Sequence, residues 1–187
     1  NISSCGEITS SGNYFLTKDI SASERCIEIH DTQNANLDCN NHIIGSTLGS
    51  SSNVDIPLIV NRVQNFSIKN CDIRPDSANL GNSIWILNSN SGTIEKNTIS
   101  QGQGKIRKID VYKSDNLKIT DNNIGGIYNQ SESSSNRIIN NRFKNDGLPS
   151  VAGVIRLTQG KNNIVENNII DGGWDGVYPE SNTIQDY

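Results

Sequence analysis

The residues that could do chemistry in this chain are a few carboxylates and one basic stretch. Two carboxylate pairs, Asp110 with Glu180 and Asp171 with Asp175, would suit a glycosidase if folding set them roughly 5 to 9.5 Å apart. The stretch KIRKIDVY, residues 105–112, would offer a uronate lyase cations and a tyrosine base. Its candidate residues are Lys105, Arg107, Lys108 and Tyr112, together with Arg156. A solvated turn of mixed charge is the commoner explanation of such a stretch, and nothing in the sequence forces either carboxylate pair together.

Metal-binding patterns are weak. His30 and His42 are the two histidines and cannot alone form a metal site, and no CxxC motif occurs. The segments KNDG (144–147) and DGGWDG (171–176) place oxygen ligands beside glycines, but turn chemistry explains both and no nonapeptide calcium repeat is present. The sequence therefore predicts neither a metal nor a cofactor.

Composition excludes other classes of protein. The 187 residues suit one domain, with 19% charged and 33% hydrophobic residues and a net charge of −4. No basic stripe is present, so we expect no nucleic-acid partner. No apolar run approaches the roughly 20 residues of a membrane helix, so we expect no membrane insertion. Because the chain contains no Met, Asn1 is expected to be a processed terminus or a domain boundary.

Cysteines and glycosylation sequons give further expectations. Four cysteines, at positions 5, 26, 39 and 71, favour two disulfides and an oxidising compartment; free buried thiols are the alternative. Three Asn-x-Ser sequons begin at Asn1, Asn65 and Asn129. In a chain this rich in Asn and Ser, they are expected by chance.

A short phrase repeats along the chain and indicates how these residues are positioned. The copies IEKNTI, ITDNNI, IINNRF and IVENNI begin at Ile94, Ile119, Ile138 and Ile164, with Asn at each fourth position. IKNCDI at Ile68 carries Cys71 instead of Asn, and LDCNNHI at Leu37 is one residue longer. An apolar residue stands ten positions before most copies: Ile27, Leu58, Ile84, Ile109 and Val154, with Tyr128 fitting less well.

The repeat predicts a solenoid of short strands. Strand-length β-branched runs alternate with Gly, Asn, Asp and Ser turns, and helical periodicity is absent. Units of about 19 to 31 residues bury a continuous core only when stacked. Leucine-rich repeats need a signature that is missing, and a propeller needs about 40 residues per blade. The remaining solution is an all-β, parallel β-helix.

Stacking also explains the repeated Asn. Equivalent residues in successive coils lie about 4.8 Å apart, so side-chain amides can hydrogen-bond along the stack as a ladder. Asn also tolerates the left-handed backbone of sharp corners. The predicted ladder is Asn97, Asn122, Asn141 and Asn167, with aliphatic stacks on either side.

The opening CGEITSSGNYFLTKDISASERCIEIHDTQNANLDCNNHIIG resembles the first coils of secreted right-handed parallel β-helix repeat proteins. That family includes periplasmic copper-binding-type repeats and carbohydrate-binding or sugar-hydrolase domains, and the resemblance covers nearly the whole chain. It implies a single-stranded right-handed β-helix of about seven coils, a secreted, cell-surface or periplasmic setting, and a Cys5–Cys26 bridge. Cys39 and Cys71 lie in neighbouring coils near one corner, so they are predicted to pair too. We expect residues 1–25 to cap the repeats of 26–187.

The resemblance also implies a groove along the first strand of each coil. Alternation predicts these outward residues there: Glu28, His30, Asn61, Trp85, Asp110, Tyr112, Arg156, Tyr178 and Glu180. Trp85, Tyr112 and Tyr178 would offer flat faces to sugar rings, and Asp110 and Arg156 would bind hydroxyls or carboxylates. The general preference of strands for aromatic residues is the alternative. The Asp-Pro-His-Asp signature of the family's epimerases and pectinase motifs are absent, and two histidines put copper binding in doubt.

Three functions remain open. We favour a non-catalytic extracellular or cell-surface structural or adhesive protein, because no catalytic set stands out and the chain is short for a β-helix enzyme. Its last unit, GVYPESNTIQDY, lacks a cap, which predicts a longer protein, a C-terminal loop over the core, or head-to-tail contact that builds filaments. The alternatives are a polysaccharide-binding module and a polysaccharide lyase or hydrolase. A lyase requires Lys105, Arg107, Tyr112 and Arg156 in one cleft; a binding face requires the three aromatics in an exposed line.

Overall fold

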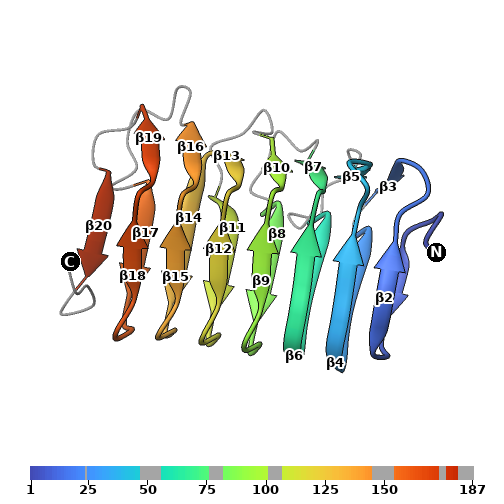
Figure 1. Ribbon diagram of the computed structural model, residues 1–187, viewed down its shortest axis with the longest axis horizontal. Coiled ribbons are helices and arrows are strands. Elements are labelled where there is room, and N and C mark those ends of the chain that lie inside the picture. Colours follow the sequence, from blue (N-terminus) through green and yellow to red (C-terminus); the bar gives the residue numbers. More distant parts are fainter. Residues whose placement is uncertain are drawn as a thin grey trace.

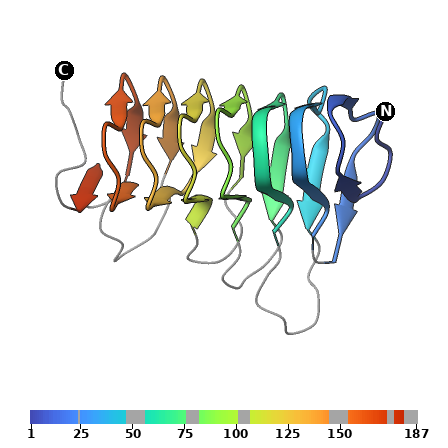
Figure 2. The same ribbon diagram turned by 90° about the horizontal axis from the view of Figure 1, so that it is seen from below.

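The computed structural model describes residues 1–23, 25–46, 56–75, 82–100, 107–144, 154–172 and 176–180. These residues form strands without helices, and all the strand pairings among them are parallel. The chain passes repeatedly through three strand positions, and each strand pairs with its equivalent in the next circuit, here called a coil. Figures 1 and 2 show the coils side by side along the long axis, from the N-terminal to the C-terminal end. This arrangement is that of a parallel β-helix.

The three strand positions define three faces of the solenoid. The first face contains β1 (Gly6–Ile8), the first part of β4 (Ile27–Asp38) and of β6 (Leu58–Lys69), β8 (Ile84–Leu87), β11 (Arg107–Tyr112), β14 (Ile127–Ser131), β17 (Ile155–Thr158) and β20 (Val177–Glu180). The second face contains β2 (Gly12–Phe15), the remainder of β4 and β6, β9 (Thr93–Glu95), β12 (Lys118–Thr120), β15 (Arg137–Ile139) and β18 (Ile164–Glu166). The third face contains β3 (Ile20–Ala22), β5 (Ile43–Ser46), β7 (Asp72–Pro75), β10 (Thr98–Ile99), β13 (Asn123–Gly125), β16 (Arg142–Lys144) and β19 (Ile169–Asp171).

Two parallel sheets result from this pairing. The long strands β4 and β6 continue from the first face to the second, so both faces belong to one 13-stranded sheet. The third face is a separate 7-stranded sheet in the order β19-β16-β13-β10-β7-β5-β3. The first face is therefore a row of adjacent parallel strands, and side chains at equivalent positions lie about one strand spacing apart.

Alternating apolar residues fill the interior in columns. On the first face the inward column is Ile27, Leu58, Ile84, Ile109, Tyr128 and Ile155. All of these are at most 1% exposed. Each aliphatic member contributes roughly 1.5–3 kcal/mol by leaving water, so the columns hold the coils together. This column explains a feature of the sequence: the apolar residue ten positions before most copies of the phrase is the inward residue of the first face.

The corners are made by single residues with positive φ. The first corner is Asp31, Arg62, Asn88, Lys113, Glu132 and Gln159; the second is Asn34, Asn65, Ser91, Asn116, Ser135 and Asn162. The third includes Asn70, Lys96, Asp121, Asn140 and Asn167. Asn and Asp tolerate this left-handed backbone best, which explains part of the Asn content. Each corner therefore uses one residue with positive φ per coil.

The buried Asn ladder is present, and its fourth member differs from the predicted one. The side-chain oxygen of Asn122 accepts hydrogen bonds from the backbone and side-chain nitrogens of Asn97, both at 3.0 Å. Asn141 serves Asn122 in the same way. Asn141 in turn donates to the side-chain oxygen of Asn168, at 2.9 Å from its backbone nitrogen. The last rung is therefore Asn168, and the prediction of Asn167 is corrected.

Asn167 instead forms the third corner. Its φ is 53°, and its side chain is exposed. In register, Val165 pairs with Ile138, so the fourth phrase begins at Val165 rather than Ile164. The same one-residue shift moves the earlier apolar position from Val154 to Ile155. The corner residue and the ladder residue are adjacent in the chain. From the sequence alone, either Asn167 or Asn168 could therefore be assigned to the ladder.

A second ladder, made of serines, was not predicted. Ser89 Oγ accepts a hydrogen bond from the backbone of Val63, Ser114 Oγ from Ser89, and Ser133 Oγ from Ser114. Each hydroxyl also donates to the carbonyl two residues earlier in its own coil. These three serines are fully buried. Both hydroxyl roles are satisfied, so polar side chains can replace apolar ones inside the narrow edge between the first two corners.

Two disulfides lie in the N-terminal part of the solenoid. Cys5 is bonded to Cys26, and Cys39 to Cys71, which joins successive coils beside the first rung of the Asn ladder. Strands β1, β2 and β3 pair with β4 and β5, so residues 1–23 contribute to all three faces. A capping role for this segment stays a prediction. In the part of the chain that the structure describes, no helix has the length and hydropathy to span a bilayer.

Candidate functional site

The first face carries most of the predicted site residues in one row. Backbone register aligns Trp85 with Asp110, Asp110 with Asn129, Asn129 with Arg156, and Arg156 with Tyr178. These residues stand on β8, β11, β14, β17 and β20, which are neighbours in the sheet. Trp85, Asp110 and Arg156 are half-buried, and the side chain of Tyr178 lies outside the described residues. The row therefore places an indole, a carboxylate and a guanidinium along the solenoid axis.

Two asparagines hold the Asp110 carboxylate. Asn129 Nδ2 donates to Asp110 Oδ1 at 2.7 Å, and Asn82 Nδ2 donates to Asp110 Oδ2 at 3.2 Å. Each carboxylate oxygen keeps further acceptor capacity, so Asp110 can accept a hydrogen bond from a bound hydroxyl while its orientation stays fixed. Nothing in the sequence indicates that Asn82 and Asn129 adjoin Asp110, because their proximity depends on how successive coils stack.

Tyr112 belongs to a different row. Register aligns it with Leu87 and Ser131, two residues along the strands from Trp85 and Asp110. It is half-buried, and the Lys113 ammonium lies 4.9 Å from its ring centroid. Lys113 therefore forms a cation–π interaction with the Tyr112 ring. The three aromatics do not form one line, and only Trp85 and Tyr178 share a row.

The proposed catalytic sets are separated or only partly described. Glu180 lies three strands from Asp110 and two residues further along, which sets their backbones roughly 14 Å or more apart. Asp175 and Lys105 lie outside the described residues, as do the side chains of Arg107, Lys108 and Glu180. Of the lyase set, Tyr112 and Arg156 are placed, and they occupy different rows of strands that are not adjacent. Convergence of that set stays a prediction.

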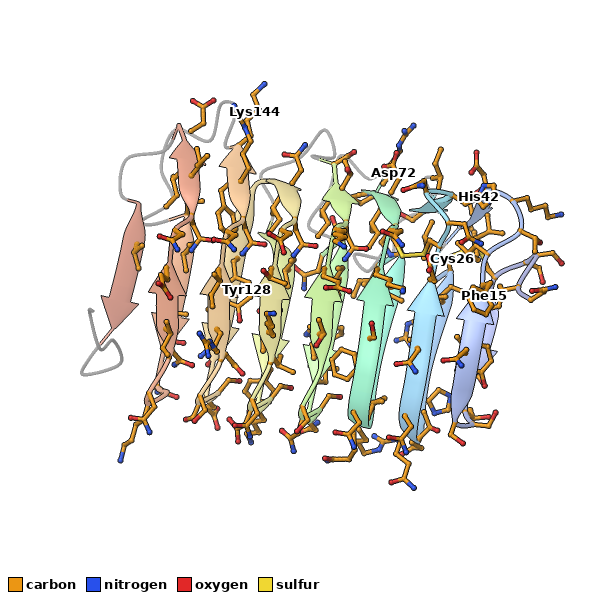
Figure 3. The ribbon with its side chains drawn as sticks, in the orientation of Figure 1. Phe15, Cys26, His42, Asp72, Tyr128 and Lys144 are labelled. Carbon is orange, nitrogen blue, oxygen red and sulfur yellow. A yellow bond between two sulfur atoms is a disulfide. The ribbon has the colours of Figure 1, made fainter. Side chains whose placement is uncertain are left out.

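Beneath this row, the interior contains a small polar cluster beside the aliphatic columns. Tyr128, labelled in Figure 3, is fully buried, and its hydroxyl donates to Gln130 Oε1 at 2.9 Å. Gln130 also accepts from Asn136 and donates to the carbonyl of Ser133. Burial, with a smaller contribution from Asp110, raises the pKa of Tyr128 well above its usual value. Tyr128 therefore stays neutral and acts as a structural group under the row.

Metal ligands do not gather within the described ranges. No group of three or more His, Cys, Asp or Glu side chains suited to a metal occurs among the residues that the structure places. His42 contacts Asp19, and His30 contacts Asp31 and Glu7. Residues 145–147 of KNDG and 173–175 of DGGWDG lie outside the described residues. Whether these two turns bind calcium therefore stays open.

His30 links the first three coils through charge. Its Nδ1 lies 3.0 Å from Asp31, its Nε2 lies 3.5 Å from Glu7, and Asp31 is paired with Arg62. The hydrogen bond with Asp31 is the main reason that the pKa of His30 is raised; burial opposes it, and the hydrogen bond with Glu7 adds to it. Protonated His30 therefore stabilises the fold below the unfolded pKa of about 6.5, and this contribution is lost as pH rises through the folded pKa.

We expect the wild-type protein to lose thermal stability through this histidine as the pH rises above about 6.5. His30→Gln should flatten that part of the profile, because glutamine does not titrate. Thermal unfolding of both proteins across the range measures the difference. An unchanged pH slope in His30→Gln would contradict the assignment.

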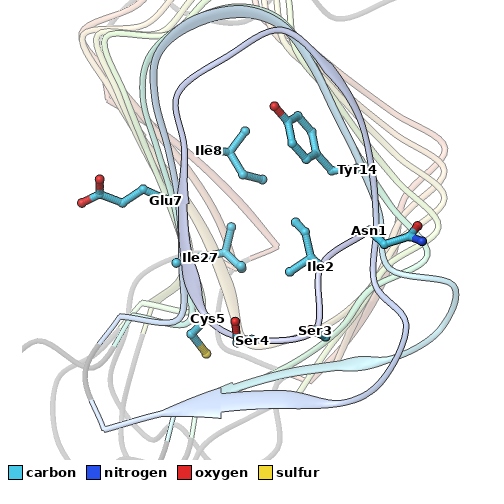
Figure 4. Close-up of a pocket in the computed structure, with 10 residues that line it drawn as sticks. Asn1, Ile2, Ser3, Ser4, Cys5, Glu7, Ile8, Tyr14 and Ile27 are labelled. Atoms are coloured by element: carbon cyan, nitrogen blue, oxygen red, sulfur yellow. The ribbon is translucent and has the colours of Figure 1, made fainter.

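A cavity of ≈ 330 Å³ opens at the N-terminal end of the solenoid. Figure 4 shows Ile2, Ile8, Tyr14 and Ile27 projecting into the first coil, while the Glu7 carboxylate points outward. Its lining also includes Asn1, Ser3 and Ser4, so the opening of the interior is mixed polar and apolar.

Comparisons with known proteins show no family for this chain. No protein-family model and no curated protein sequence matches this chain. It is similar to a structure from Parabacteroides merdae provisionally assigned as a glycosyl hydrolase, at 14% identity and a TM-score of 0.49, covering 89% of this chain and 80% of that one. It is also similar to a DFA-IIIase from Arthrobacter chlorophenolicus without its lid, at 11% identity and a TM-score of 0.34, covering 94% and 62%. Membership of the β-helix repeat family stays a prediction, and the chemistry of the site is argued from its own residues.

Proposed function

We propose that this chain is an extracellular parallel β-helix protein that binds an extended polysaccharide on its first face. The observation that carries the proposal is the register that aligns Trp85, Asp110, Asn129 and Arg156 on four successive strands. An indole gives a sugar ring an apolar platform, and the neighbouring carboxylate and guanidinium give its hydroxyls an acceptor and a donor. Such a row repeats at about one strand spacing, so it suits a linear polymer better than a small molecule.

The position of Asp110 favours binding over hydrolysis. Asn82 and Asn129 orient its carboxylate. The backbone of Glu180, the partner carboxylate considered for it, lies three strands away, roughly 14 Å or more from that of Asp110. We therefore propose recognition without bond cleavage, with lyase or hydrolase activity as the alternative.

Trp85→Ala is expected to weaken binding of a soluble polysaccharide about 10-fold or more, which corresponds to about 1.4 kcal/mol. Affinity electrophoresis through gels containing neutral glucans or uronate polymers measures the change. Phe15→Ala is the matched control, because Phe15 is an exposed aromatic on β2 of the second face. It should be retarded like the wild type.

The same experiment separates the alternatives. Equal retardation of wild type and Trp85→Ala in every gel would overturn the proposed face. Shortening of a polymer by the wild-type protein would replace binding with catalysis. Loss of retardation in Phe15→Ala would move the site to the second face.

The finer features of the fold and setting belong to this proposal. We infer a right-handed solenoid of about seven coils, as the resemblance implies. Two disulfides favour an oxidising compartment, so we propose a secreted or cell-surface location.

A structural role through self-association is the second candidate. At the C-terminal end, the inward residues Val165, Ile170 and Val177 are only half-buried, whereas their equivalents one coil earlier are at most 1% exposed. In a second copy stacked head to tail, such side chains would pack against Ile2, Ile8 and Ile27, which line the N-terminal cavity together with polar residues. Light scattering over a concentration series tests this role: mass that grows with concentration supports it, and a constant monomer mass removes it.

A further inference from the structure

The structure separates the three Asn-x-Ser sequons by accessibility. Asn65 lies at the second corner, with a φ of 53° and an exposed side chain. Asn129 lies in the row on the first face and is 7% exposed. Asn1 is exposed as well. Two of these sites therefore offer an amide to solvent, and one does not.

The amide of Asn65 is held weakly. Its Nδ2 donates to Asn34 Oδ1 at 3.4 Å, near the outer limit of a hydrogen bond. Phe66 points inward and is 3% exposed, while Ser67 stands half-exposed on the second face. The backbone of Asn65 is fixed by its own hydrogen bond to the carbonyl of Asn90. A substituent on this amide therefore displaces one exposed, long contact and leaves the coil intact.

Asn129 differs from Asn65 in both accessibility and hydrogen bonding. Its Nδ2 donates to Asp110 at 2.7 Å, and its neighbours in the row are Asp110 and Arg156. A glycan on this nitrogen would break the bond that orients Asp110 and would have to pass between half-buried side chains. Loss of this part-buried hydrogen bond would leave the Asp110 carboxylate without one of its two amide donors, before any steric effect.

We propose that Asn65 is an N-glycosylation site and that Asn129 is excluded by the fold. The donor is an oligosaccharide linked to a polyprenyl diphosphate. A bond forms between the Asn65 amide nitrogen and the anomeric carbon of the first sugar, the bond from that carbon to the diphosphate oxygen breaks, the amide nitrogen loses a proton, and the lipid diphosphate leaves. Residues 62–64 separate this corner from the first face, so the glycan leaves the polysaccharide row open. The site is independent of what that row binds.

Secretion from eukaryotic cells that carry out N-glycosylation tests the proposal. We use Asn1→Gln as the background, so that the mass reports Asn65 and Asn129 alone. A single glycan is expected on this protein, and peptide-N-glycosidase should remove it and leave aspartate at position 65 in peptide mass spectra. Asn65→Gln and Ser67→Ala should each abolish the mass increase, and Asn129→Gln should retain it.

The two loss variants guard against a folding artefact. Ser67→Ala keeps Asn65 at the corner and removes only the sequon hydroxyl, so it distinguishes loss of the acceptor motif from disturbance of the left-handed turn. Secreted Asn1→Gln protein with unmodified Asn65 would overturn the proposal. A glycan found on Asn129 of secreted protein would also overturn it.

Discussion

Asn122→Ala is expected to reduce the free energy of unfolding by about 3 to 5 kcal/mol, which is large for a polar side chain. Asn122 is 2% exposed, in the middle of the ladder. Its oxygen accepts from the backbone and side-chain nitrogens of Asn97, and its amide donates to Ile94 and Asn141. Alanine removes all four of these contacts, and it leaves the buried backbone N–H of Asn97 without its acceptor.

Urea unfolding of the purified protein measures this loss, with Asn123→Ala as the matched control. Asn123 follows directly in the chain, and its side chain is exposed on the third face. We expect its replacement to change the free energy of unfolding by no more than about 0.5 kcal/mol. Equal stability of the two variants would show that the ladder contributes little.

The general architecture was readable from the sequence because burial acts on each coil in the same way. Ile68, Ile94, Ile119 and Ile138 all face the interior, so selection for an apolar residue recurs at each pass of the chain. The resulting phrase predicts stacked parallel strands before any contact is known. The disulfide positions, by contrast, rested partly on a resemblance, since spacing alone leaves the pairing of four cysteines open.

The register at the C-terminal end could not be read in the same way. Asn167 and Asn168 are chemically identical, yet one makes a left-handed corner and the other a ladder rung. Several corners carry Lys96, Arg62 or Glu132, whose residue types give no sign of positive φ. At these corners, stacking on the neighbouring coils imposes the backbone geometry. The conformational propensities of the residue types do not predict it.

The sequence names several residues of the candidate row, but it does not show how they are arranged. Alternation along a strand shows that Trp85, Asp110 and Tyr112 point outward. It does not show which residues of different strands are neighbours, because that depends on coil lengths and loops. Pairing places Trp85 beside Asp110 and moves Tyr112 to another row, and it also brings Asn129 against Asp110.

Gly160→Ala is expected to destabilise the protein by about 3 kcal/mol or more, although the sequence pattern points the other way. Gly160 follows Ser89, Ser114 and Ser133 in the serine column, so a small side chain looks acceptable there. A Cβ at Gly160 would lie 1.8 Å from the carbonyl oxygen of Ser133. That carbonyl also accepts a hydrogen bond from Asn163 Nδ2 at 3.2 Å, so the backbone cannot shift without breaking a buried contact.

Thermal and urea unfolding measure the effect, and Gly6→Ala provides the control, because a Cβ at Gly6 meets nothing within 4 Å. We expect Gly6→Ala to stay within about 0.5 kcal/mol of the wild type. A Gly160→Ala protein as stable as the wild type would mean that the coil containing Ser133 stands further from its neighbour than the structure shows. Because this coil carries Asn129, and the next carries Arg156, the close approach at Gly160 also fixes the spacing between these two residues of the first-face row.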